Sequence, residues 1–296
     1  MPAIAFHARR IVQLLPGLIL FALLTAGAAR AADDAAGLRA KYAELRVQLA
    51  NNQFQKPVFM DSSESADRLS GTIYAVIEQP FAVASAALEQ PAAWCDILFL
   101  HLNTKYCRVS GAQNPVLDVA IGEKHEQPLA DASRVQFDFR APVKSADYLR
   151  VTLSADKGPL ATRDYRIVFE AAPLDAGRTF IHFDYSYAYG LAGKLAMGAY
   201  LGTAGSARVG FTVVGTQADG KPKYVGGTRG VVERNTMRYY LAVEAHLGAL
   251  SSPPQARIEK SLRDWFAATE RYPQQLHELG QAEYLDMKRR EYQRQS

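Results

Sequence analysis

The chain has 296 residues, with 34 Lys and Arg, 30 Asp and Glu, 48% hydrophobic residues, 22% charged residues and two cysteines. This length suffices for one large domain or two smaller ones, each with a hydrophobic core. The composition excludes a disordered or collagen-like chain, and two cysteines are too few for a disulfide scaffold. The net charge of +4 would favour an anionic partner, but much of this charge comes from arginines in the N-terminal segment.

Residues 1–31 have the pattern of a secretory signal peptide. Arg9 and Arg10 form a basic region, an apolar core follows over residues 11–24, and small residues fill 25–31 with two small-x-small cleavage sites. An uncleaved anchor is the alternative, but a membrane span needs about 20 apolar residues and this core contains Pro16. We therefore expect export across the inner membrane, with the periplasm as the destination.

Removal of this segment changes the charge balance. It takes away three arginines and no acid, which leaves 31 basic and 30 acidic residues. A nucleic-acid-binding protein needs a basic stripe to displace counterions, and no such stripe is left. We therefore expect no nucleic-acid partner.

Cys95 and Cys107 are twelve residues apart, and in an oxidising compartment we predict that they form a structural disulfide. A redox-active pair would show the closer C-x-x-C spacing. A zinc site needs four ligands, and only His101 lies nearby. We therefore predict no metal site and no cofactor.

The segment 32–68 is predicted to be an N-terminal helix followed by a linker. Leu38, Tyr42, Leu45 and Leu49 recur at helical spacing, which favours an amphipathic helix over 34–51. Residues 56–68 contain one proline and several serines, which is typical of a linker or wrapping segment.

From Leu69 the hydrophobic period changes to two, as in a strand, and this strand ends at Pro80. Two short helices are predicted over 81–89 and 91–102. Later runs alternate apolar and polar residues, which predicts an antiparallel sheet with one solvated face. These predicted strands cover 134–140, 149–154, 165–170, 178–189 and 208–213.

The strand 178–189 has two different faces. One carries His182, Asp184 and Ser186, which we expect to be solvated, and the other carries a row of Tyr and Phe. The three polar residues are not a catalytic triad, because a straight strand supplies no sharp turn that exposes a serine. The tyrosine row is expected to be core or cavity wall.

A long helix is predicted over 231–250, with an apolar stripe that covers about half its circumference. Glu244 projects into this stripe. A carboxylate buried there must be paired or protonated, so it either binds a ligand, acts as an acid or base, or pairs with a cation for structural reasons. Beyond the Ser-Ser-Pro-Pro break, residues 251–296 are predicted to form a helical extension, with an amphipathic helix around 258–266 and a charged helix over 273–293.

The segment from Ile73 to Phe81, which continues to Trp94 and Leu98, resembles the start of START-like proteins, the SRPBCC superfamily that includes polyketide cyclases. In that superfamily a strand ends in proline, two helices follow with a Trp before the second, and a run of strands leads to a long helix. The resemblance covers 69–250 and implies an α+β helix-grip fold, in which a curved antiparallel sheet wraps around the long C-terminal helix. The extra flanking helices and the segment 190–205 depart from that pattern.

The resemblance also implies a ligand site between the sheet and the long helix. The same side chains would build a filled core equally well, and the glycine-rich segment 190–205 would be either a gate or a simply packed helix. The residues expected to bind the ligand are Met237, Tyr240, Leu241 and Glu244 of the helix and Phe137, Phe139, Phe169, Tyr185 and Phe211 of the sheet.

We therefore expect a periplasmic START-like protein that binds a lipid or another apolar small molecule, and we assign no catalytic residue. One alternative is a cyclase or dehydratase that uses Glu244 with Tyr185 or Tyr240. Another is an envelope protein that docks through its flanking helices. The adjacent charges Lys288, Arg289 and Arg290 would favour only weak peripheral contact with an anionic membrane.

Overall fold

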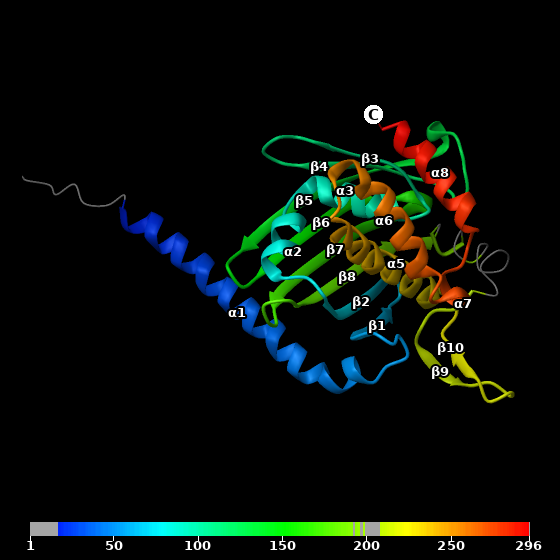
Figure 1. The fold of residues 1–296 in the computed structure, drawn as a ribbon, viewed down its shortest axis with the longest axis horizontal. Coiled ribbons are helices and arrows are strands. Elements are labelled where there is room, and N and C mark those ends of the chain that lie inside the picture. Colours follow the sequence, from blue (N-terminus) through cyan, green and yellow to red (C-terminus); the bar gives the residue numbers. More distant parts are fainter. Residues whose placement is uncertain (1–16, 192, 196–197, 199–207, 296) are drawn as a thin grey trace, which may run out of the picture.

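An eight-stranded antiparallel sheet is the centre of the computed structural model, which describes residues 17–191, 193–195, 198 and 208–295 (Figure 1). The strands follow the spatial order β1-β2-β8-β7-β6-β5-β4-β3, so β2 lies beside β8 although β3 to β7 intervene in the sequence. The strands are β1 (Val58–Glu64), β2 (Arg68–Ile77), β3 (Thr104–Ser110), β4 (Val116–Ile121), β5 (Ser133–Lys144), β6 (Leu149–Lys157), β7 (Thr162–Pro173) and β8 (Thr179–Tyr189).

The helix α5 (Gly227–Ala249) lies across one face of this sheet. It packs against β1, β2 and β8, and on its other side against α3 (Pro91–Leu100) and α6 (Pro254–Thr269). The residues of β5 alternate between the two faces of the sheet. Val135, Phe137 and Phe139 are buried on the core face, while the residues between them are exposed on the other face. Gly71 of β2 lets the helix approach closely, since a Cβ there would lie 2.2 Å from Oγ1 of Thr236.

The helix α1 (Gly17–Ala50) covers part of the opposite face of the sheet. Its side chains Ala35, Leu38, Leu45 and Leu49 are buried and pack with Phe180 and Tyr148 in a second hydrophobic cluster. In Figure 1 the N-terminal part of α1 extends away from the sheet, and only its C-terminal part lies against it. No helix in the described ranges combines the length and the hydropathy that a membrane span requires.

The other helices surround α5 and the end of the sheet. α2 (Phe81–Leu88) and α3 connect β2 to β3, and α7 (Pro273–Leu276) and α8 (Gln281–Gln293) follow α6. Short 3-10 turns are present at η1 (Leu129–Asp131) and η2 (Pro159–Ala161), and β9 (Val213–Thr216) pairs with β10 (Pro222–Tyr224) in a separate hairpin.

The α+β helix-grip prediction is confirmed by this arrangement. A strand, two helices, a run of antiparallel strands and a long helix occur in the expected order, and the long helix lies on the sheet. β1 is an additional edge strand, which pairs with β2 from Val58–Ala75 to Glu64–Leu69.

Several predicted elements differ from the observed ones. The expected linker over 56–68 contains β1, the helix over 34–51 is the C-terminal part of the longer α1, and the last helix is divided into α7 and α8. The strands β3 and β4 were not predicted. Most of the segment 190–205, which was considered as a gate, lies outside the described residues.

The predicted strand over 208–213 is wrong, because residues 208–212 are not part of the sheet. The backbone N–H groups of Phe211 and Thr212 donate to the Glu233 carboxylate of α5, at 2.5 and 2.9 Å. These donors are therefore not available to a strand ladder, although the side chains alternate as they would in a strand.

Candidate functional site

Most of the predicted ligand-binding residues lie in one hydrophobic core between the sheet and α5. Met237 and Leu241 of α5 are fully buried, and the sheet residues Phe137, Phe139, Phe169 and Tyr185 belong to the same core. Phe169 contacts Trp94 of α3 edge to face, with the ring centroids 5.8 Å apart. Five pockets are lined by residues that the structure describes, and none of these five lies between the middle of α5 and the strands β5–β8.

Five tyrosines meet in this core, and we call them the tyrosine cluster: Tyr165 of β7, Tyr185, Tyr187 and Tyr189 of β8, and Tyr239 of α5. The rings of Tyr165 and Tyr187 are stacked with centroids 5.2 Å apart, and Tyr185 meets Tyr239 edge to face at 5.3 Å. The ring of Phe137 lies edge to face on Tyr165. The strand period of two places the three β8 tyrosines on the inner face together, as the sequence predicts.

The hydroxyl groups of the tyrosine cluster differ in their partners. Those of Tyr165 and Tyr189 lie within hydrogen-bonding distance of Oγ1 of Thr162 (2.7 Å) and Oε1 of Glu64 (3.4 Å). Those of Tyr185, Tyr187 and Tyr239 form no hydrogen bond within the described part of the chain. Burial raises the pKa of all three, so the hydroxyls are protonated and able to donate.

Glu244 and Tyr240 lie together at another place, near the C-terminal half of α5. Nζ of Lys56 donates to both carboxylate oxygens of Glu244 at 2.6 Å. Burial, with the Glu244 carboxylate nearby, raises the pKa of Tyr240 well above its ordinary value. Lys56 and Glu244 line a pocket of about 250 Å³ with residues 76–79 of β2 and the following loop. The structural ion pair is thus the observed environment of Glu244, and its cation is Lys56.

Phe211 belongs to the same large core as the other predicted residues but does not come from the eight-stranded sheet. It packs with Phe54 and Tyr272, with ring centroids 5.6 and 5.5 Å away. The prediction placed it on a sheet strand, and the Glu233 contacts show why it is not on one.

The outer face of β7 and β8 is less solvated than predicted. Nδ1 of His182 lies 2.5 Å from Oε2 of Glu170, and the His182 ring stacks on Tyr74 with centroids 4.5 Å apart. Tyr148 also donates to Glu170. Because α1 covers Phe180 beside this network, the face expected to be fully solvated is partly buried.

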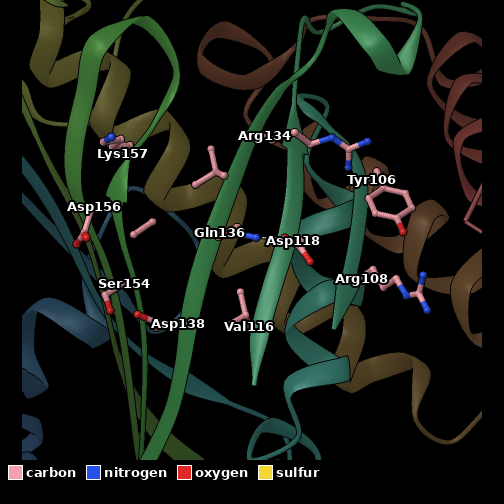
Figure 2. A pocket seen from close by; sticks show the side chains of 12 residues that line it. Tyr106, Arg108, Val116, Asp118, Arg134, Gln136, Asp138, Ser154, Asp156 and Lys157 are labelled. Carbon is pink, nitrogen blue, oxygen red and sulfur yellow. Dashed lines mark hydrogen bonds between the residues drawn. The ribbon is translucent and has the colours of Figure 1, made fainter. Parts of the chain in front are cut away.

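The largest of the described pockets, about 790 Å³, is an open groove on the outer face of β3–β6 (Figure 2). Figure 2 shows Asp118, Gln136 and Asp138 projecting from neighbouring strands, and Arg134 near the ring of Tyr106. Arg108, Arg134 and Lys157 line it together with Asp118, Asp138 and Asp156. Because charges of both signs line this exposed groove, it favours no single class of ligand.

The structure contains a compact group of buried charged side chains that the sequence pattern does not predict. Glu291 of α8 pairs with Lys105 (3.0 Å) and Lys288 (2.7 Å), and all three side chains are almost completely buried. Lys288 also donates to the carbonyl oxygen of Thr104, and burial lowers its pKa to about 8. The i, i+3 spacing of Lys288 and Glu291 in a charged helix is too common to indicate burial.

The three adjacent cations at 288–290 differ in exposure. Lys288 is buried, while Arg289 pairs with Glu259 at 2.6 Å and Arg290 with Glu126 at 2.6 Å, and both arginines stay partly exposed. These contacts attach α8 to α6 and to the loop that precedes η1, and weak contact of the two arginines with an anionic membrane stays a prediction.

The predicted disulfide between Cys95 and Cys107 is present and joins α3 to β3. Within the described ranges, no three His, Cys, Asp or Glu side chains lie close enough together to hold a metal ion.

No protein-family model and no curated protein matches the sequence. Solved structures with a similar fold include norcoclaurine synthase from Thalictrum flavum, with 12% identity over 46% of this chain and 86% of that chain and a TM-score of 0.34. A conserved protein from Geobacillus kaustophilus is 15% identical over 46% of this chain and 85% of that chain, with a TM-score of 0.31. The Zhui aromatase/cyclase of a Streptomyces species is 11% identical over 72% and 95%, with a TM-score of 0.28.

These likenesses are too distant to add weight to the fold assignment. The strand order and the position of α5 on the sheet define the fold as a helix-grip fold.

Proposed function

We propose that the chain binds a lipid or another small molecule with an apolar body, between the sheet and α5 and against the tyrosine cluster. The observation that carries this proposal is the set of hydroxyls of Tyr185, Tyr187 and Tyr239, which belong to buried or half-buried side chains and form no hydrogen bond within the described residues. Such hydroxyls are available to donate to an acceptor atom on a ligand. A ligand with an apolar body and a few acceptor atoms would use both the rings and the hydroxyls.

We further propose that the protein acts in the periplasm. Two features support this location: the disulfide between Cys95 and Cys107, which persists in oxidising compartments, and the packing of α1. Ala35, Leu38, Leu45 and Leu49 of α1, which pack in the second hydrophobic cluster, all follow the expected cleavage sites, so removal of residues 1–31 keeps these contacts. Mass spectrometry of the protein from the periplasmic fraction should give a mature chain that begins at Ala29 or Ala32. An intact chain found only with the membrane or the cytoplasm would contradict the proposal.

Ligand binding is tested by extraction. The mature protein is purified without detergent and extracted with organic solvent, and the extract is analysed by mass spectrometry. We expect a small molecule at close to one copy per protein. In the double variant Tyr185→Phe/Tyr187→Phe the rings are kept and two hydroxyls are lost, so the retained amount should fall about tenfold. Tyr292→Phe, at an exposed residue of α8, is the matched control.

A neutral fluorescent probe, N-phenyl-1-naphthylamine, gives an independent measurement. The protein should bind it with an increase in fluorescence, and the extracted molecule should displace it. If the extract contains no small molecule and the probe does not bind, the proposal is wrong.

A further inference from the structure

The two border strands of the eight-stranded sheet differ in how their free edges are covered. β3 forms one border, and α8 with the residues that follow it covers this edge. The backbone N–H of Cys107 donates to Oε1 of Gln295 at 2.9 Å. Lys288 donates to the carbonyl oxygen of Thr104 at 2.6 Å. β1 forms the other border, and within the described ranges its only strand partner is β2 (Figure 1).

The register of β1 on β2 determines which backbone groups of β1 point outward. The N–H of Val76 donates to the carbonyl oxygen of Pro57 at 3.0 Å. Because hydrogen-bonded and non-hydrogen-bonded pairs alternate along an antiparallel ladder, the odd-numbered residues of β1 bond to β2. The N–H and C=O groups of Val58, Met60 and Ser62 therefore point to the free side of the strand.

Met60 lies at the centre of this free side. The N–H of Val58 donates to the carbonyl oxygen of Lys56 at 2.7 Å, and the N–H of Ser62 donates to Oδ1 of Asp61 at 2.8 Å. The N–H and the carbonyl oxygen of Met60 form no hydrogen bond with the described part of the chain. Both groups are therefore available to the backbone of an additional strand.

A groove of about 320 Å³ follows this part of β1. Val58, Phe59 and Met60 all line it, although their side chains alternate between the two faces of the sheet. The groove therefore runs along the backbone edge of the strand. We call it the β1 groove.

Two other segments form the remaining walls of the β1 groove. One is the end of α1 with the turn that follows it, between Gln48 and Phe54, and the other is residues 211–213. Nε2 of Gln53 donates to the carbonyl oxygen of Phe211 at 2.7 Å, which joins these two walls. The groove is thus bounded on both sides of the space that an added strand would fill.

The chemistry of the lining favours an uncharged occupant. The rings of Phe54 and Phe211 are buried with their centroids 5.6 Å apart, while the amide side chains of Gln48 and Asn51 are exposed. No charged side chain is among the lining residues of the β1 groove. A charged group in the groove would therefore lose hydration without gaining a counter-charge from its walls.

We propose that the β1 groove binds an extended, uncharged peptide segment of another polypeptide, which adds a strand beside β1. Main-chain hydrogen bonds to Met60 hold this segment, and the rings of Phe54 and Phe211 contact its alternate, apolar side chains. A second copy of this chain fits less well, because its own β1 is flanked by the same two walls. The groove is separate from the tyrosine cluster, so this interaction goes beyond the proposed function.

The test uses a library of random heptapeptides displayed on phage and selected against the mature, disulfide-bonded protein. The enriched peptides should alternate apolar and neutral polar residues. The most enriched peptide is then synthesised with a fluorescent label, and its affinity is measured by anisotropy. In the isotope-labelled protein, the amide proton of Met60 should exchange with solvent more slowly when this peptide is bound. If no peptide is enriched, or if bound peptide leaves the exchange of Met60 unchanged, the inference is wrong.

Two variants of Met60 separate backbone pairing from side-chain contact. Met60→Pro removes the outward-facing N–H and keeps the ladder to β2, because proline is tolerated on an edge strand where its nitrogen faces solvent. The peptide should bind this variant at least about tenfold more weakly. Met60→Ala, the matched control, also loses the side chain but keeps the N–H, and it should bind nearly as tightly as the wild type. Equal affinities of the two variants would overturn the inference.

Methylated peptides test the same hydrogen bonds without changing the protein. N-methyl groups are placed on the odd-numbered or on the even-numbered residues of the peptide, so each pattern blocks one edge of the added strand. The pattern that blocks the edge facing β1 should weaken binding at least about tenfold more than the other pattern. Two patterns that bind alike would contradict an added strand.

Two further measurements separate this inference from its neighbours. Tyr185→Phe/Tyr187→Phe should bind the peptide as the wild type does, so the proposed function can fail while the β1 groove still binds peptide. Sedimentation of the wild type should show a monomer. A dimer that dissociates in Met60→Pro would instead assign the groove to a second copy and overturn the proposed partner.

Discussion

Glu291 is the residue whose replacement should affect stability most clearly. Its carboxylate is the partner of both Lys105 and Lys288, and all three side chains are buried. Glu291→Gln would leave two buried ammonium groups without a counter-charge, which costs about 3–5 kcal/mol. Urea unfolding should show this decrease in the free energy of unfolding.

Lys288→Met is the informative counterpart. It removes one cation and leaves Lys105 paired with Glu291, so its free energy of unfolding should stay within about 1 kcal/mol of the wild type. If the two variants are equally destabilised, charge balance does not determine the stability of this group.

Glu170 makes stability depend on pH. Burial acts to raise its pKa, but hydrogen bonds from His182 and Tyr148 outweigh burial and hold the pKa below its ordinary value. The folded state therefore binds this proton less readily than the unfolded state. The stabilisation is present above about pH 4.5 and is lost as the pH falls through the lowered pKa.

The comparison with Glu170→Gln measures this contribution. The difference in the free energy of unfolding between wild type and variant should be largest at pH 6 and should shrink by pH 3. A difference that is constant over that range would show that Glu170 titrates alike in the folded and unfolded states.

At the scale of elements, the contact between β2 and α5 depends on Gly71. In Gly71→Ala the new methyl group would meet Thr236 at 2.2 Å, so α5 must move away from the sheet. Such overpacking costs about 1–3 kcal/mol. Gly37→Ala, on the exposed side of α1 with nothing within 4 Å, should instead stabilise by up to about 1 kcal/mol. Thermal unfolding of both variants measures this contrast, and a neutral Gly71→Ala would contradict the close approach.

The disulfide joins two elements that are neighbours in the sequence, α3 and β3. Its loop is short, so the chain-entropy model assigns it about 3 kcal/mol of stability. Unfolding of the wild type with and without reductant, compared with Cys95→Ala/Cys107→Ala, should show this loss. If reduction leaves the free energy of unfolding unchanged, the pair does not constrain the unfolded chain.

The elements that could be predicted are those whose pattern arises from burial on one face. β2, β5 to β8 and α5 each alternate or repeat in this way, and the sequence places Tyr185 on the inner face of β8 correctly. β1 was not predicted because Asp61, Ser62 and Ser63 are typical of a loop, and only its pairing with β2 makes it a strand. The reverse holds for Phe211, whose backbone N–H donates to Glu233 and not to a strand of the eight-stranded sheet.

The site was predicted only in part for the same reason. Apolar core positions such as Met237 and Leu241 follow from periodicity, which the local sequence contains. The ion pairs of Glu278 join residues that are far apart in the sequence, from Lys124 to Arg238. No local pattern contains such a pairing, so neither these ion pairs nor the Lys56–Glu244 pair could be derived from spacing.

At the scale of the whole molecule, the flanking helices are part of the fold. α1 packs on the outer face of the sheet, and α6 packs against α5 and α8. The apolar faces that would have served docking in an envelope interaction protein are thus used within the chain. This favours a self-contained binding protein over a helical docking module.

The pairing of β2 with β8 has a consequence for how the chain becomes folded. β2 ends at Ile77, and its partner β8 begins only at Thr179. During synthesis, β2 therefore cannot pair with β8 until about a hundred further residues have been added to the chain. The surface that α1 covers includes Phe180 of β8 and therefore does not exist before that point. The helix α1, which precedes all of these strands in the sequence, is consequently among the last elements to be buried.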